Sequence, residues 1–392
     1  MESNRHPDKV GIYLHIPFCE KKCFYCDFYS IESLSQRNEF VNSLVKEIEL
    51  FSANRAEILC ADSIFLGGGT PSLLSPRELE IILNSLHKHF NISAEAEFTM
   101  ECNPGTVNRQ SLARYHQLGI NRLSFGVQSF FDDELKFLSR IHNSQQAVEA
   151  FRFARAAGFD NVNIDLMYGL PKQTEDKLLS NLENAVALNP EHISAYDLIV
   201  EHGTPFFAAV ASGEISPLDE PTEVRMYESV MSFLEKNGYK HYEISNYSQP
   251  GLECKHNLKY WNSEEYIGFG PSAHSYLHGS RWWNISSLGG YIADLSDGLL
   301  PISANEKLTD TQLVDEFVML QLRQGKMNLR TLHDKFGINL DSDFISDLKN
   351  AGYADVRGIE ILLTKKGFTV CDEIAEEILA RYSDLIQTPL SD

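Results

Sequence analysis

The chain lacks any run of about 18 apolar residues, so the sequence predicts no membrane-spanning helix. Residues 1–9 also lack the apolar segment of a secretory signal. Positive charge is scarce: 34 Lys and Arg face 55 Asp and Glu, and the net charge is -21. This excess of negative charge opposes general binding to nucleic acid or anionic membranes. Cysteines number only seven, an odd count, which favours a reducing cytoplasm over a disulfide framework. The sequence therefore predicts a cytoplasmic protein.

Three of the cysteines gather in the spacing C-x3-C-x2-C, at Cys19, Cys23 and Cys26. Three thiolates can hold three irons of a 4Fe-4S cluster and leave the fourth iron open to a small molecule. A structural zinc needs four ligands, and no second pair of cysteines or histidines at zinc spacing follows. Packing in a core is disfavoured because the charged residues 20–22 lie between the first two cysteines. The spacing therefore indicates an iron–sulfur site.

The run from Tyr13 to Phe28 resembles the cluster loop of radical S-adenosylmethionine (SAM) proteins. Its beginning, Tyr-x-His-Ile-Pro-Phe-Cys, is similar to the branch that contains the oxygen-independent coproporphyrinogen III oxidase (HemN) and the HemW-type heme chaperones. The resemblance extends over residues 10–379. It implies that the amino and carboxylate groups of SAM bind the fourth iron, and that the reduced cluster cleaves SAM to a 5′-deoxyadenosyl radical.

Segments with strand character alternate with amphipathic segments of helical period along residues 1–204. Strands are expected at 11–15, 63–66, 97–101, 122–127, 161–167 and 193–199, and helices at 39–50, 77–90, 145–157 and 175–188. Repeated strand–helix units predict right-handed crossovers and a parallel sheet. The fold class is therefore α/β, a partial (β/α)6 TIM-like barrel of the radical SAM type.

Residues 205–305 are less regular and rich in aromatics and glycine, and they are expected to extend the barrel, with one βα-like unit at 221–242. Residues 306–392 predict helices at 309–322, 329–336, 341–350 and 364–379, with a hairpin at 353–356 and 359–363. This order is typical of a small winged-helix-like α+β domain. Residues 341–380 hold nine acidic and four basic side chains, so DNA binding is not expected there.

Glycines and polar residues stand where the predicted strands end, which is the chemical end of a parallel barrel. Tight turns and buried structural pairs are the alternative explanations. The resemblance assigns these residues, with Tyr13, to SAM: Tyr13, Gly68, Gly69, Thr70, Glu101, Gln128, Arg140 and Asp165. In the HemN family the last three types contact a second SAM, and the number of SAM molecules here stays open.

Two features separate the branches of this resemblance. Phe28 stands where the oxidase has a fourth cysteine, and only twelve residues precede Tyr13, so the oxidase's substrate-binding extension is not expected. The second feature is H-N-x-x-Y-W, from His256 to Trp261. Histidine is a common axial ligand of heme iron, and aromatic rings can cover a porphyrin. A packed, hydrogen-bonded histidine explains the pattern as well. The resemblance implies heme binding at His256.

The resemblance thus implies a heme chaperone that carries a SAM-ligated 4Fe-4S cluster, binds heme and transfers it to an acceptor hemoprotein. Coproporphyrinogen III oxidase activity is not expected. The alternatives are an oxygen-independent coproporphyrinogen III dehydrogenase and a radical SAM enzyme with another substrate. A homodimer and transient contacts with membrane proteins stay open, and nucleic acid is not expected as a partner.

Overall fold

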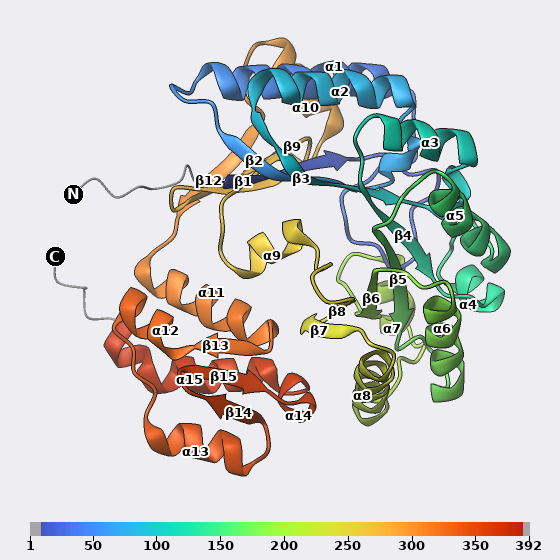
Figure 1. Ribbon diagram of the computed structural model, residues 1–392. Helices are drawn as coiled ribbons and strands as arrows, with labels where there is room; N and C mark the ends of the chain where they lie inside the picture. Colours follow the sequence, from blue (N-terminus) through green and yellow to red (C-terminus); the bar gives the residue numbers. More distant parts are fainter. Residues whose placement is uncertain (1–8, 387–392) are drawn as a thin grey trace.

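Six parallel strands form the centre of a curved twelve-stranded sheet in this computed structural model, which describes residues 9–386 (Figure 1). Residues 1–8, for which the sequence predicts no secretory signal, lie outside the described residues. The central strands, each parallel to the next, are β1 (Lys9–Ile16), β2 (Cys60–Gly68), β3 (Asn91–Cys102), β4 (Arg122–Gln128), β5 (Val162–Tyr168) and β6 (His192–Asp197). Within residues 9–386, no helix combines the length and apolar character that crossing a bilayer requires.

Alternation along the strands separates an outer packed face from an inner face. In β1, Ile12 and Leu14 are fully buried in the core beneath the helices, while Tyr13 and His15 point to the inner side. The outer helices along this part of the chain are α1 (Arg37–Ala53), α2 (Pro76–His89), α3 (Arg109–Gln117), α4 (Asp132–Phe137), α5 (Ser144–Ala156) and α6 (Glu175–Ala187). The six predicted strands and four predicted helices are all present, so the α/β barrel prediction is confirmed.

Capping residues explain where several helices begin and end. Ser75 precedes α2 and forms a capping box with Glu78: each side chain accepts a hydrogen bond from the other residue's backbone N–H. Gly119 and Gly158 follow the ends of α3 and α5 with φ of +97°, a conformation that favours glycine. These local signals set the ends of the helices, which lie on the outer side of the sheet (Figure 1).

The segment predicted as a barrel extension supplies strands to both edges of the sheet. After α7 (Pro205–Ala211) and α8 (Glu220–Lys236), β7 (Lys240–Glu243) and β8 (Asn246–Ser248) join the β6 edge. The chain then forms α9 (Lys255–Trp261), and β9 (Tyr266–Phe269) pairs parallel with β1. The remaining elements at this edge are β10 (His274–Leu277), β11 (Ser280–Asn284), α10 (Leu288–Ser296) and β12 (Ile302–Lys307). β12 runs across residue 305, where the sequence predicted a domain boundary.

The C-terminal part contains the predicted helices and hairpin. Its elements are α11 (Asp310–Arg323), β13 (Lys326–Asn328), α12 (Leu329–Phe336), α13 (Ser342–Asn350), β14 (Ala354–Arg357), β15 (Glu360–Leu363), α14 (Lys365–Phe368) and α15 (Cys371–Ile386). β13 adds a third strand to the hairpin, in the order β13-β15-β14. The predicted single helix at 364–379 is divided into α14 and α15. Phe368, the last residue of α14, packs against the ring of His241, with 4.1 Å between centroids.

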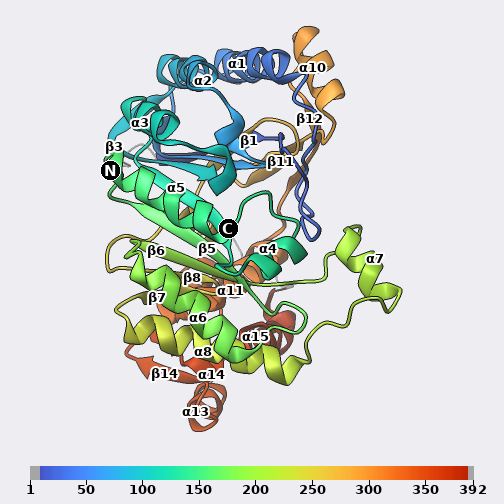
Figure 2. The ribbon, with the colours of Figure 1, turned by 90° about the vertical axis from the view of Figure 1, so that its right-hand side faces the viewer.

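Helix α9 and the C-terminal domain border the inner face of the sheet. Figure 1 shows α9 on this face, across the sheet from α1 and α2, with the C-terminal domain beside it. The side chain of Gln324, the residue that follows α11, donates a hydrogen bond to the carbonyl of Trp261 at 2.9 Å, which joins the domain to α9. Figure 2 shows α7 projecting to one side of the molecule. Its Phe206 packs against Phe24 of the loop after β1.

Candidate functional site

The loop that carries the three clustered cysteines begins where β1 ends, and backbone hydrogen bonds close its base. The N–H of Cys19 donates to the carbonyl of Ile31 at 2.9 Å, and the N–H of Ile31 donates to that of Pro17 at 2.7 Å. Cys19 is buried, while Cys23 and Cys26 are partly exposed. The loop therefore presents three thiols from a fixed base at the carboxyl end of β1.

Polar donors reach two of the three sulfur atoms. The hydroxyl of Thr70 donates to the sulfur of Cys19 at 3.6 Å, and the guanidinium of Arg140 donates to that of Cys23 at 3.3 Å. Burial raises the pKa of Cys26 to about 11. Because a metal or cluster binds the thiolate, it would have to displace this proton on binding.

The arrangement of the thiols fits a cluster better than a single ion. Within residues 9–386, no group of three or more His, Cys, Asp or Glu side chains is placed to hold one metal ion. A 4Fe-4S cluster does not need such a group, because each thiolate binds a different iron. Hydrogen bonds to the sulfurs are one of the means by which a protein sets a cluster's reduction potential. The surroundings of Cys19, Cys23 and Cys26 therefore fit a cluster, and their role as its ligands stays a prediction.

The glycines at the end of β2, Gly68 and Gly69, allow close contact with the cysteine loop. A Cβ atom on Gly69 would lie 2.6 Å from the carbonyl oxygen of Phe18 and 2.8 Å from that of Ile16. Gly68 has φ of +103°, and its added Cβ would lie 2.5 Å from the His15 ring. The backbone of this loop can approach the cysteine loop only without side chains. The predicted tight turn is thus present, and its residues Gly68, Gly69 and Thr70 adjoin the cysteines.

Glu101 lies at the end of β3 and joins the glycine loop. Its carboxylate accepts a hydrogen bond from the N–H of Gly68 at 3.2 Å. Burial, and then the nearby carboxylate of Asp165, raise the pKa of Glu101 to about 8. A group that binds as a positive charge or as a pair of hydroxyl donors would favour the ionised form of Glu101.

Asp165 on β5 belongs to a buried hydrogen-bond network. Its two carboxylate oxygens accept from Ser124 at 3.0 Å and from Asn163 at 2.7 Å. Burial raises the pKa of Asp165. Since both oxygens already have partners, a ligand at Asp165 would have to share them.

Gln128 and Arg140 meet beyond the end of β4. Gln128 has φ of +68°, which is rare for a residue other than glycine. The guanidinium of Arg140 donates to the carbonyl of Gly126 at 2.5 Å. The Oε1 of Gln128 and the Nε of Arg140 are buried and have no hydrogen-bond partner in the described chain. Buried polar atoms seldom stay unpaired, so this pair fits a site that a polar ligand completes.

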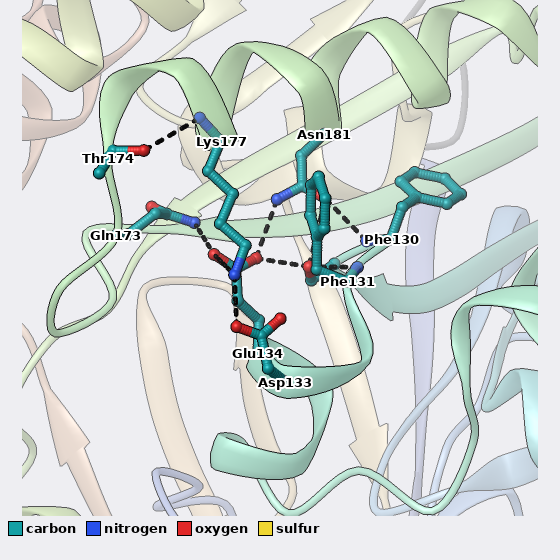
Figure 3. A network of polar contacts seen from close by, with 9 residues as sticks. Phe130, Phe131, Asp133, Glu134, Gln173, Thr174, Lys177 and Asn181 are labelled. Atoms are coloured by element: carbon teal, nitrogen blue, oxygen red, sulfur yellow. Dashed lines mark hydrogen bonds and ion pairs between the residues drawn. The ribbon is translucent and has the colours of Figure 1, made fainter.

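A network of hydrogen bonds around the carboxylate of Glu134 holds the turn after β4, as Figure 3 shows. Glu134 at the start of α4 accepts hydrogen bonds from Ser129 at 2.5 Å, Asn181 at 2.9 Å and Gln173 at 3.0 Å. The ammonium of Lys177 lies 3.6 Å from the same carboxylate. These bonds tie α4 and α6 to the turn and so hold the strained end of β4 in place.

Two residues of this region were not predicted from the sequence. Tyr25 is partly buried between the second and third cysteines, where Arg140 and Cys23 are its neighbours. Asp197 ends β6, and its Oδ1 is buried without a partner in the described chain. Burial raises the pKa of Asp197 to about 6. Its position at a strand end was the signal that could have identified it.

His256 lies on α9, deep on the inner face of the sheet. The helix begins on a carboxylate, because the N–H of His256 donates to Glu97 at 3.2 Å. Both ring nitrogens have partners: Nδ1 lies 2.9 Å from the hydroxyl of Ser63, and Nε2 lies 2.8 Å from that of Tyr260. The ring also stacks on Phe65, with 5.3 Å between centroids. Burial lowers the pKa of His256 to about 3.

These contacts agree with the alternative explanation of the motif, in which His256 is a packed, hydrogen-bonded histidine. His256 is 1% exposed, so binding an iron would require its ring to leave one hydrogen-bond partner. Its ligation of heme stays a prediction. In the structure, the ring holds the hydroxyl of Tyr260 in position.

A cavity of about 350 Å³ lies between the cysteine loop, the inner face of the sheet and α9. It is lined by Tyr13, His15, Asp27, Phe28, Tyr29, Tyr260, Tyr266, Ser272 and His274. A volume of this size falls within the ~300–1,000 Å³ typical of small-molecule sites. The cavity brings together Tyr13, Phe28 and Tyr260, which the sequence had marked in separate motifs.

Residues 13–185 match the model of the radical SAM superfamily. Among solved structures, the coproporphyrinogen III oxidase HemN from Escherichia coli superposes with a TM-score of 0.81 at 24% identity, covering 96% of this chain and 91% of that chain. At this identity the likeness shows the fold.

Curated relatives cover from two thirds to nearly the whole of the chain. The heme chaperone HemW of Bacillus subtilis is 36% identical over 371 residues, which are 92% of this chain and 97% of that protein. The protein of the same name from Escherichia coli is 39% identical over 271 residues, 68% of this chain and 69% of that protein. With these relatives and the matched domain, the chain belongs to the radical SAM superfamily and, within it, to the family of heme chaperone HemW.

Proposed function

We propose that this protein is a heme chaperone: it binds heme and transfers it to an acceptor hemoprotein, with a SAM-ligated 4Fe-4S cluster as part of its machinery. Membership of the radical SAM superfamily implies SAM and the cluster. The curated relatives named heme chaperones support the heme function. The observation that carries it is the aromatic cavity beside the cysteine loop, because tyrosine rings can pack against a porphyrin.

Cys19, Cys23 and Cys26 are the proposed cluster ligands, and the polar donors around their sulfurs support this assignment. When bound, the cluster supplies an iron with open coordination sites and a source of single electrons. In this proposal, Thr70 and Arg140 hold the thiolates by charge-assisted hydrogen bonds.

Contacts with SAM are proposed for the residues that border the cysteine loop. Glu101 would accept hydrogen bonds from the ligand's hydroxyls, and Gln128 and Arg140 would use the buried atoms that now lack partners in the described chain. Tyr13, Gly68, Gly69, Thr70 and Asp165 complete the proposed set.

Phe28 separates this proposal from coproporphyrinogen oxidation. Its ring is 62% exposed at the border of the cavity, at the position where the oxidase family carries a further cysteine. An exposed phenyl ring suits contact with an apolar macrocycle.

The test is to add ferric heme and, in a separate assay, coproporphyrinogen III with SAM and a reductant to the anaerobically reconstituted protein. We expect a shift of the heme Soret band at stoichiometric protein and no protoporphyrinogen. SAM-dependent decarboxylation of coproporphyrinogen III, without heme uptake, would reverse the choice of function.

A further inference from the structure

The lining of the cavity beside the cysteine loop combines aromatic rings with a histidine whose ring nitrogens form no hydrogen bond to the described residues. Tyr29, Tyr260 and Tyr266 line it, and His274 lies at its wall. Alternation along β10 places His274 on the inner face of the sheet, because Ser275 and Leu277 are buried while His274 is exposed and lines the cavity. The cavity therefore offers an apolar surface together with an imidazole.

Three histidines are near enough to this region to be compared as iron ligands. His15 has both ring nitrogens engaged, with a tyrosine hydroxyl at 3.1 Å and a backbone carbonyl at 2.8 Å. His256 is engaged at both nitrogens as well and does not line the cavity. His274 makes no hydrogen bond through its ring to any described residue. Of the three, His274 alone can offer a nitrogen without breaking a contact.

The ring of His274 is nevertheless held in orientation. It stacks on the ring of Trp283, with centroids 5.7 Å apart and 22° between the planes. Partial burial lowers the pKa of His274 below its usual value, which favours the neutral form of the imidazole that binds metals. A stacked, neutral imidazole with a free nitrogen suits axial ligation of heme iron.

A second cavity of about 270 Å³ adjoins the first and shares Tyr260 and Tyr266 with it. Arg281 is the cation among its lining residues. In the β10–β11 hairpin, Arg281 faces Tyr276, two residues from His274 on the same face. The guanidinium pairs with Glu316 at 2.8 Å and with Glu306 at 3.4 Å. The propionate groups of a heme are anionic, so a propionate that pairs with Arg281 has to displace one of these carboxylates or share the guanidinium with it.

We propose that heme binds in these adjoining cavities with its iron ligated by the imidazole of His274, its ring against Tyr260 and Tyr266, and a propionate toward Arg281. This assignment rests on the proposed heme-binding function and specifies its site. His256 is then a positioning residue, since its Nε2 holds the hydroxyl of Tyr260.

The test is resonance Raman spectroscopy of ferrous heme added to the anaerobically reconstituted full-length protein. We expect an iron–histidine stretching band in wild type, its loss in His274→Ala and its restoration by added imidazole. His256→Ala should keep the band while weakening heme uptake. His278→Asn is the matched control, because His278 is an exposed histidine four residues away with φ of +51°, which Asn tolerates; it should keep the band.

The cluster provides a fold check, since His274→Ala should retain the iron content and the SAM-induced change of the cluster spectrum. If His274→Ala keeps the iron–histidine band and His256→Ala loses it, His256 is the ligand and our assignment is wrong, while the heme function stands. If wild type takes up no heme, the proposed function falls, and this site with it.

Discussion

Replacing Gly69 by Ala tests whether the glycines after β2 exist to let the cysteine loop approach. The new methyl group would lie 2.6 Å and 2.8 Å from the backbone oxygens of Phe18 and Ile16. The same two oxygens accept hydrogen bonds from the N–H groups of Thr70, at 2.7 Å, and Gly69, at 2.8 Å. Because both obstacles are backbone, neither can rotate away, and the two loops must separate.

The cost follows from those two bonds. Stretching or breaking two backbone hydrogen bonds in a buried site, at ~1 to 1.5 kcal/mol each with some loss of packing, gives about 2–4 kcal/mol. Gly69→Ala should therefore lower the free energy of unfolding by that amount and reduce the iron bound after reconstitution.

The assay is urea unfolding followed by circular dichroism, with iron and sulfide measured on the reconstituted protein. Gly289→Ala is the control, because a Cβ there meets no atom within 4 Å and Gly289 lies in α10, where alanine favours the helix. If Gly69→Ala unfolds within about 0.5 kcal/mol of wild type and binds full iron, the close approach of the loops does not explain the glycine.

The remaining predictions concern the cluster, pH and a buried carboxylate. Cys26→Ala should abolish the iron–sulfur absorbance and Cys60→Ala should not; equal iron in both variants would contradict the cluster assignment. The folded pKa of Glu101, about 8, exceeds its ordinary value of 4.5, so its contribution to stability is complete below pH 4.5 and is lost as the pH rises through 8. Between pH 4.5 and 9, the free energy of unfolding of wild type should thus fall by about 3–5 kcal/mol more than that of Glu101→Gln. If urea unfolding gives the same pH dependence for both proteins, this reasoning is refuted. Glu47 accepts three buried hydrogen bonds, so Glu47→Gln should lower the free energy of unfolding by about 1–3 kcal/mol. The control Glu49→Gln, at a partly exposed position, should not lower it. A Glu47→Gln unfolding curve that matches wild type would count against the network.

The parallel centre of the fold could be predicted because its signals are local. Each parallel strand except β6 is seven or more residues long, and amphipathic helices lie between successive strands. The short strands β7 to β11 have five residues or fewer, too few for a period of two to stand out. Their identity depends on pairing: β8 pairs with β6 and β9 with β1, and the other three strands pair with one another or with these two, which no local pattern records.

The candidate site also contains residues that could be predicted from local sequence signals and residues that could not. The cysteines, Glu101 and Gln128 could be identified because a spacing or a strand end marks them. His274 could not, because it lies on a four-residue strand and has no motif around it. The sequence marked His256, but only the structure shows that both of its ring nitrogens are occupied. A cavity assembled from residues as far apart as Tyr13 and His274 leaves no signal in either segment.

The order of strands in the sheet has a consequence for synthesis of the chain on the ribosome. Of the described strands, β1 is synthesised first, but its neighbour β9 is complete only at Phe269. At the other edge of the parallel centre, β6 is paired only after β8 has been synthesised. Until those segments emerge, the parallel centre has two open edges, each a row of unpaired backbone groups able to pair with another chain. A nascent chain halted near residue 200 is thus an aggregation-prone intermediate, and the segment containing α9 protects both edges within one short interval of translation.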